Sequence, residues 1–123
     1  MARPMKTPGP DHPITIEPNP ARVTVRVGDK IVADTTAALN LREADYPAVP
    51  YIPLADVDPA LLKPTDTSTY CPYKGDASYY TVVLPDSELT DVVWTYREPH
   101  PAVAEIAGHV AFYPNKVEIS EAA

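Results

Sequence analysis

The chain has 123 residues, of which 45% are hydrophobic and 22% are charged. This length fits one ordinary domain with enough apolar material for a core, which excludes a disordered chain and a second full-sized domain. Seventeen Asp and Glu against ten Lys and Arg give a net charge of −7, which repels the phosphates of nucleic acids and anionic membrane surfaces. We therefore expect neither nucleic acid nor a membrane as a partner.

The single cysteine and the lack of long apolar runs predict the compartment. Cys71 has no second cysteine for an internal disulfide, and one thiol is too few for a Cys-based zinc site. No apolar run approaches the roughly 20 residues of a membrane span. Residues 1–6 lead into prolines rather than into the apolar core of a signal peptide. The sequence therefore predicts a cytoplasmic protein.

Prolines divide the chain into short pieces. There are sixteen of them, and because each lacks a backbone N–H and restricts the residue before it, long helices are excluded. Six prolines fall within the first twenty residues. We expect residues 1–12 to form a flexible, proline-rich arm and residues 13–123 to form a single β domain.

The first clear element is a hairpin over residues 22–34. Valines alternate with polar residues over 22–27, which indicates a half-buried strand. Gly28 supplies the positive φ that a tight hairpin turn requires. Residues 35–43 would suit either a helix or a strand, but the stretch is short and its β-rich neighbours favour a strand around residues 38–42.

The middle of the chain predicts a strand followed by a short helix. Residues 49–54 form a strand whose two prolines place it at an edge or a bend. Asp58 can cap a short helix that begins at Pro59 and ends at Pro64.

A second helix and further strands complete the domain. The helix begins at Pro101, ends at Gly108 after about two turns, and has Val103 and Ile106 on one side. The remaining strand candidates are rich in β-branched and aromatic residues and span 67–70, 78–84, 91–96, 110–113 and 116–120. Together these elements predict a mainly β, small single-domain fold, either an antiparallel β-barrel or a pair of packed sheets, with two short helices.

The most unusual segment runs from Tyr70 to Tyr80 and contains a tight loop at residues 71–75. Loops of this kind on rigid scaffolds often carry binding residues. An ammonium group near a thiol favours the thiolate, so we take Cys71, Tyr73 and Lys74 as candidate catalytic residues. No histidine is adjacent to act as a base for Cys71, and a small buried hydrophobic residue is the simpler interpretation of it.

The three histidines lack the spacing of a metal site. His12 lies in the arm, His100 lies between two prolines, and His109 begins a strand. None of them is spaced from Cys71 as zinc ligands are. We predict no metal site.

Aromatic and polar residues elsewhere would complete a binding site. Alternation places Ser78 with Tyr80 on one face of their strand, and Trp94 with Tyr96 on one face of theirs. If these faces line one cavity, the rings provide contact area while hydroxyl and basic groups orient a ligand. The alternative is an aromatic core with tyrosine hydroxyls at its rim. The candidate ligand-binding residues are Arg42, Tyr51, Ser78, Tyr80, Trp94, Tyr96 and Tyr113.

Several motifs resemble those of one bacterial family. They are Leu41-Arg42-Glu43, Tyr51-Ile52-Pro53, Tyr70-Cys71-Pro72-Tyr73-Lys74-Gly75 and Trp94-Thr95-Tyr96. In order and spacing they are similar to the domain-of-unknown-function family numbered 427. The resemblance implies a mainly β domain related to the β-tent folds, and it implies no activity. The family sometimes carries a nucleotidyltransferase label, but four scattered glycines and one Asp-x-Asp, at Asp56 and Asp58, do not make a magnesium and phosphate site.

The sequence predicts that the domain binds a small polar or anionic, partly aromatic molecule beside the 71–75 loop, without a cofactor. Two alternatives stay open. One is a small cofactor-independent enzyme (a cyclase, isomerase or hydrolase) in which Lys74 or a tyrosine moves protons and Arg42 stabilises an anion. The other is a structural or protein-interaction module that uses an edge strand or the arm, and a homodimer is also open.

Overall fold

Two antiparallel β-sheets form the structure, a computed structural model that describes residues 5–122. The larger sheet has seven strands, in the spatial order β1 (Ile14–Asn19), β4 (Ala38–Glu43), β5 (Val49–Pro53), β9 (His109–Phe112), β8 (Glu88–Thr95), β7 (Gly75–Val83) and β6 (Leu62–Cys71). The smaller sheet has the order β10 (Glu118–Ala122), β2 (Arg22–Val27) and β3 (Lys30–Thr35). The prediction of a mainly β, antiparallel fold is therefore confirmed. Because the larger sheet ends at β1 and β6, the described chain forms two packed sheets and not a closed barrel.

The helical segments are short 3₁₀ helices, namely η1 (Leu54–Asp56), η2 (Pro59–Leu61) and η3 (Pro101–Ile106). The two predicted helices correspond to η2 and η3. Asp58 caps η2 as predicted, since its side chain accepts a hydrogen bond of 3.0 Å from the Ala60 N–H. The predicted end of this helix at Pro64 is wrong, because η2 ends at Leu61 and Pro64 lies within β6. Proline is tolerated there because β6 is an edge strand whose pairing with β7 shifts register between Pro64 and Ser68. None of the helices within residues 5–122 is long and apolar enough to cross a membrane.

The predicted hairpin over 22–34 is formed by β2 and β3, with Gly28 at a φ of 59° in the turn. Val23 and Val25 are almost fully buried, as their alternation indicates. The strand favoured over 38–42 is β4. The sequence patterns did not predict β1, because Pro18 lies within it, and its place at the edge of the sheet accommodates that proline.

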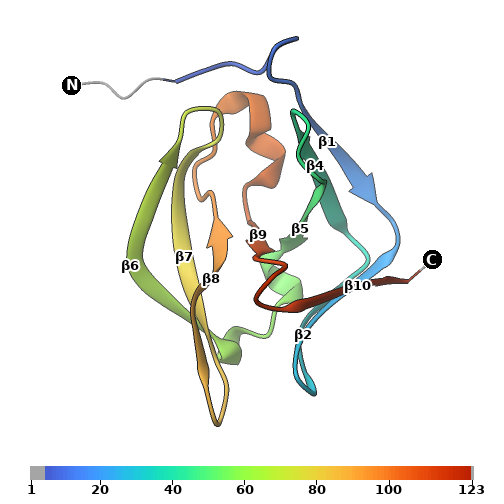
Figure 1. Cartoon of the computed structure of the whole chain (residues 1–123), viewed down its shortest axis with the longest axis vertical. Helices are drawn as coiled ribbons and strands as arrows, with labels where there is room; N and C mark the ends of the chain where they lie inside the picture. Colours follow the sequence, from blue (N-terminus) through green and yellow to red (C-terminus); the bar gives the residue numbers. More distant parts are fainter. Residues whose placement is uncertain (1–4, 123) are drawn as a thin grey trace.

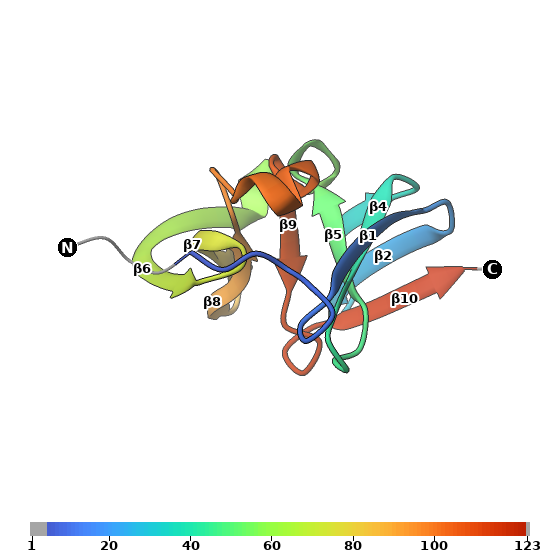
Figure 2. The ribbon, with the colours of Figure 1, turned by 90° about the horizontal axis from the view of Figure 1, so that it is seen from above.

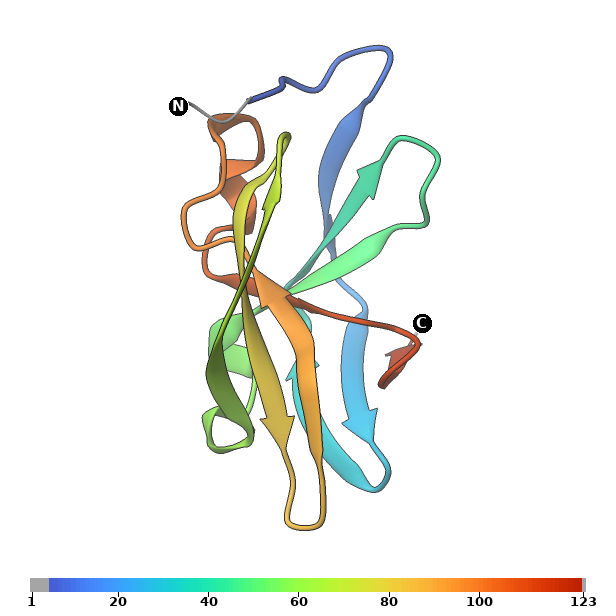
Figure 3. The same ribbon diagram turned by 60° about the vertical axis from the view of Figure 1, so that its left-hand side comes forward.

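The larger sheet is folded into two wings that stand apart at one end of the molecule (Figure 1). One wing contains β6, β7 and β8, the other contains β1, β4 and β5, and β9 lies between them. η3 lies at the open end. The turns of the β2–β3 and β7–β8 hairpins lie at the opposite end (Figure 3).

Two clusters of buried side chains fill the molecule. The first, here called the aliphatic core, packs the two sheets together and is rich in valine; it includes Val23, Val25, Val32, Ile52, Val82, Val92, Val93 and Phe112. The second, here called the aromatic cluster, joins the two wings and η3. It consists of Leu41, Tyr51, Ala77, Tyr79, Tyr96, Val103, Ile106 and Ala111.

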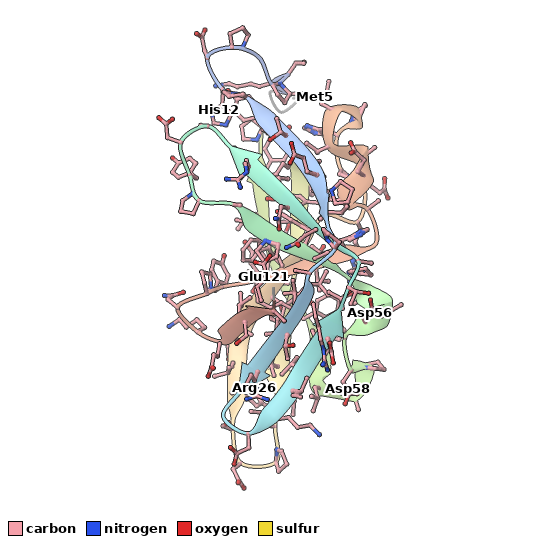
Figure 4. All side chains as sticks on the ribbon, turned by 90° about the vertical axis from the view of Figure 1, so that its right-hand side faces the viewer. Met5, His12, Arg26, Asp56, Asp58 and Glu121 are labelled. Atoms are coloured by element: carbon pink, nitrogen blue, oxygen red, sulfur yellow. The ribbon has the colours of Figure 1, made fainter. Side chains whose placement is uncertain are left out.

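The described part of the arm, residues 5–12, crosses from one wing to the other (Figure 2). The Lys6 N–H donates to the Pro72 carbonyl at 2.9 Å, and a tight turn between Gly9 and His12 precedes β1. Figure 4 shows His12 beside the start of β1, at the far end of the molecule from Arg26 in the β2–β3 hairpin. The arm thus spans the open end of the fold. Residues 1–4 of the predicted arm lie outside the described residues.

Candidate functional site

A cavity of about 230 Å³ lies between the two wings. One side is formed by β4, β5 and the loop that joins them, and the other side by the 71–75 loop, β7, β8 and the residues that follow β8 and β9. Six of the lining side chains are aromatic, and two are charged. The lining residues are Leu41, Glu43, Tyr46, Pro47, Val49, Tyr51, Lys74, Tyr79, Trp94, Tyr96 and Tyr113.

Strand alternation explains which residues reach the cavity. Leu41 and Glu43 of β4 line it, so Arg42 between them points to the opposite face and is exposed. Trp94 of β8 is the direct cross-strand partner of Tyr79 on β7, and both rings line the same wall. Antiparallel pairing therefore gathers aromatic side chains from separate strands onto one surface.

Glu43 has two basic partners at the edge of the cavity. The Lys74 ammonium group donates to Glu43 Oε1, and His12 Nε2 lies 2.7 Å from Glu43 Oε2. The side chains of Glu43 and Lys74 are only 15% and 12% exposed, so the ion pair is shielded from solvent. Burial works against the charged form of Glu43, but the hydrogen bonds from Lys74 and His12 outweigh it and hold the pKa of the carboxyl below its usual value. Glu43 is therefore a carboxylate at neutral pH.

The arm fixes the position of Glu43 and of the 71–75 loop. The His12 ring stacks on Tyr73, with 4.0 Å between ring centroids and 10° between the planes. The Ala44 N–H donates to the Pro13 carbonyl at 2.8 Å, and Ala44 has a φ of 48°, a left-handed conformation that is costly for alanine. The turn that follows Glu43 and the loop that carries Lys74 are thus both held by the segment before β1.

Three tyrosines of the cavity, Tyr51, Tyr96 and Tyr113, have hydroxyl pKa values above the usual range. Burial raises the pKa of Tyr51, and the hydrogen bond from Trp94 only partly offsets this. Burial likewise raises the pKa of Tyr96. For Tyr113, burial and the neighbouring Tyr79 hydroxyl raise the pKa to about 12. These groups therefore act as neutral hydrogen-bonding groups and not as phenolates near neutral pH.

The structure brings five of the predicted site residues to this cavity. They are Tyr51, Lys74, Trp94, Tyr96 and Tyr113. Trp94 contacts two of the others, because its indole N–H donates to the Tyr51 hydroxyl at 3.1 Å and its ring centroid lies 4.6 Å from that of Tyr113. Lys74 joins the group from the loop, with its ammonium 5.9 Å from the centroid of the Tyr96 ring.

The other predicted site residues lie elsewhere. Ser78 and Tyr80 face away from the cavity because Tyr79 between them faces it. Ser78 lines a separate polar depression with Arg97 and His100, and the Arg97 guanidinium lies 5.9 Å from the Tyr80 ring.

Two residues of the loop also lie outside the cavity lining. Cys71 is a half-buried free thiol that packs against the aromatic cluster. Tyr73 contacts the arm through His12. Of the three candidate catalytic residues, only Lys74 reaches the cavity.

Sequence reasoning missed Glu43, Tyr79 and His12 as site residues. Glu43 could have been found from β4 itself, because it shares a face with the apolar Leu41 while Arg42 does not. Tyr79 follows from the same alternation once the face of β7 is known. His12 could not have been found in this way, because it meets Glu43 across 31 positions of sequence.

Among residues 5–122, no group of three or more His, Cys, Asp or Glu side chains is placed to hold a metal ion. A family model described as a domain of unknown function, DUF427, matches residues 15–123. The chain belongs to the DUF427 family. No curated protein matches it. The DUF427 description states no activity, so the cavity is the feature of this DUF427 domain that bears on its function.

Proposed function

We propose that this DUF427 domain binds a small polar or anionic, partly aromatic molecule in the cavity between its wings. The observation that carries the proposal is the combination of six aromatic side chains with a shielded Glu43–Lys74 ion pair around about 230 Å³. A cavity of roughly 150 Å³ is enough to hold benzene, whereas pockets that bind drug-sized ligands measure roughly 300 to 1,000 Å³. The volume therefore suits a single substituted ring.

The lining supports recognition of such a ring. Trp94 and Tyr113 offer ring surface to a ligand, while Tyr51 and Tyr96 are buried in the packed wall of the cavity. Because these rings are already held in place, little conformational entropy is lost when a ligand binds. Lys74 and the tyrosine hydroxyls supply the few polar groups that fix the orientation of a ligand. The 71–75 loop brings Lys74 to the cavity, so movement of this loop would control access.

A fragment screen tests the proposal. We would screen a library of small neutral, acidic and basic ring compounds by ligand-observed NMR against the full chain, and we would record native mass spectra of protein purified from its own host. We expect hits that compete with one another and that weaken in Trp94→Leu. The matched control is Tyr80→Phe, which removes one hydroxyl on the face of β7 opposite to Tyr79 and should keep every hit. A library without hits, together with host-purified protein that carries no ligand, would reject the proposal.

A cofactor-independent enzyme is the second candidate, and the Lys74–Glu43–His12 arrangement favours it. The Lys74 ammonium, positioned beside the cavity by the Glu43 carboxylate, can donate a proton to a ligand. Hits from the screen would be incubated with the protein in D₂O, and exchange of their C–H protons would be followed by NMR. Proton exchange that depends on Glu43 and Lys74 would support catalysis. Hits that bind without exchange or conversion would contradict the enzyme and leave ligand binding as the function.

The proposal places the domain in the cytoplasm. The free thiol of Cys71 fits a reducing compartment. Fractionation of host cells with an antibody against the folded domain would test this location.

A further inference from the structure

Lys74 and Glu43 differ in the hydrogen-bonding capacity that they leave for a ligand. Both carboxylate oxygens of Glu43 already have partners, one in Lys74 and the other in His12. The Lys74 ammonium carries three N–H donors, and Glu43 Oε1 takes one of them. A ligand in the cavity therefore meets donors of Lys74 more readily than acceptors of Glu43.

Tyr51 adds a second directed donor. An indole N–H can only donate, so the Tyr51 oxygen is the acceptor in its 3.1 Å hydrogen bond with Trp94. The Tyr51 O–H proton is then left to be donated to another acceptor. Because Tyr51 is only 1% exposed, bulk water does not compete strongly for that proton.

The position of Lys74 disfavours a cationic ligand, although an aromatic lining alone would suit one. Glu43 and Lys74 together carry no net charge, so the cavity edge has no excess negative charge to attract a cation. The protein's own Lys74 ammonium already lies over the Tyr96 ring at 5.9 Å. A second cation would have to displace Lys74 or lie beside it.

We propose that the ligand of this cavity is a flat aromatic or heteroaromatic ring that carries a carboxylate or carbonyl oxygen. This inference rests on the proposed binding function and names its ligand class. The oxygen accepts hydrogen bonds from Lys74 and the Tyr51 hydroxyl, and the ring packs against Trp94 and Tyr113. The specificity comes from the donors, and the contact area comes from the rings.

Four simple probes test the ligand class on the full chain at neutral pH. Benzoate has the ring and the carboxylate, benzylamine has the ring and a cation, toluene has the ring alone, and acetate has the carboxylate alone. We expect benzoate to bind at least about tenfold more tightly than each of the others, since a hydrogen bond to a charged group contributes roughly that factor. Saturation-transfer NMR titrations give the four affinities.

Variants locate the interaction. Tyr51→Phe removes one hydroxyl and should weaken benzoate about fivefold to tenfold while leaving toluene unchanged. Lys74→Met should weaken benzoate more strongly, but it also leaves Glu43 with one partner fewer. The double variant Glu43→Gln with Lys74→Met removes that imbalance and should keep the fold while benzoate binding stays weak. Tyr80→Phe, the matched control, should not change any of the four affinities.

Two outcomes would overturn the ligand class while leaving the binding function in place. One is tighter binding of benzylamine than of benzoate, which would make the cavity a cation site. The other is equal binding of toluene and benzoate, or equal benzoate binding by wild type and Tyr51→Phe. If none of the four probes binds but other compounds in the fragment library do, the ligand class also fails and the binding function stands. If nothing binds at all, both proposals fail.

Discussion

The aliphatic core, which lies between the two sheets, and the aromatic cluster, which lies between the two wings of the larger sheet, are built from different side chains. The aliphatic core consists mainly of valines, which fill the space between the sheets with stiff, purely apolar groups. The aromatic cluster contains three tyrosines, whose rings are buried but whose hydroxyls need partners or open space. The side chains of the aliphatic core therefore fill the space between the sheets, whereas the aromatic cluster lies beside a cavity that has polar groups at its edge.

The largest effect should come from a change in the aliphatic core. Ile52 is fully buried in this core, whereas the adjacent Tyr51 belongs to the cavity wall. Ile52→Ala should lower the free energy of unfolding by about 2–5 kcal/mol, the usual cost of such a truncation. Urea denaturation measures this loss, and cavity ligands should still bind below the transition. A loss smaller than 1 kcal/mol would contradict the distinction between the two regions.

A smaller effect is expected from Lys74→Met at the edge of the aromatic cluster. The substitution keeps the apolar length of the side chain but takes one partner from the shielded Glu43 carboxylate. We expect a loss of about 1–3 kcal/mol, partly recovered when Glu43→Gln is added. Urea denaturation of the two single variants and the double variant gives the coupling energy. Strictly additive losses would show that the ion pair does not stabilise the fold.

The two regions should also differ in how pH affects stability, because the buried residues of the aliphatic core include no titratable group. The pKa of Glu43 is lower in the folded protein than its usual value of 4.5. Its contribution is therefore complete above that pH and is lost as the pH falls through the folded pKa. Between pH 6 and 3, wild type should lose more stability than Glu43→Gln.

Asp34 provides the control for this pH series. Its pKa is also lowered, chiefly by the hydrogen bond from Arg22, but the pair is exposed on the β2–β3 hairpin. Asp34→Asn should change the acid dependence less than Glu43→Gln does. Superimposable pH profiles for wild type and Glu43→Gln would mean that the Glu43 hydrogen bonds do not depend on its charge.

The smallest effect is expected from Ser78→Ala and Tyr80→Phe. Each removes one hydroxyl from the face of β7 opposite to Tyr79. Each should change the free energy of unfolding by no more than about 0.5 kcal/mol and leave cavity ligands unaffected. Loss of a cavity ligand in either variant would mean that both faces of β7 contribute to binding.

The parts of the fold that depend on local chemistry could be predicted from the sequence. Valine alternation and Gly28 specified the β2–β3 hairpin, and Asp58 with Pro59 specified the start of η2. β1 could not be predicted, because Pro18 argues against a strand unless the edge position is already known.

The candidate site was predictable in its composition and not in its geometry. Aromatic residues and Lys74 could be singled out as residue types, but the face of β7 depends on tertiary packing, so Tyr79 was overlooked in favour of Tyr80. The contact between His12 and Glu43 joins the arm to β4, and no local pattern signals a meeting of that kind.

The crossing of the open end by residues 5–12 has a practical consequence for anyone who labels or immobilises this domain. A bulky fusion at the amino end would disturb residues 5–12. This segment donates a hydrogen bond to the Pro72 carbonyl of the 71–75 loop and contacts Glu43 through His12. A fusion at the carboxyl end would follow β10, which belongs to the smaller sheet. Affinity tags, fluorophores and surface couplings therefore belong at the carboxyl end if the cavity is to be measured in its native form.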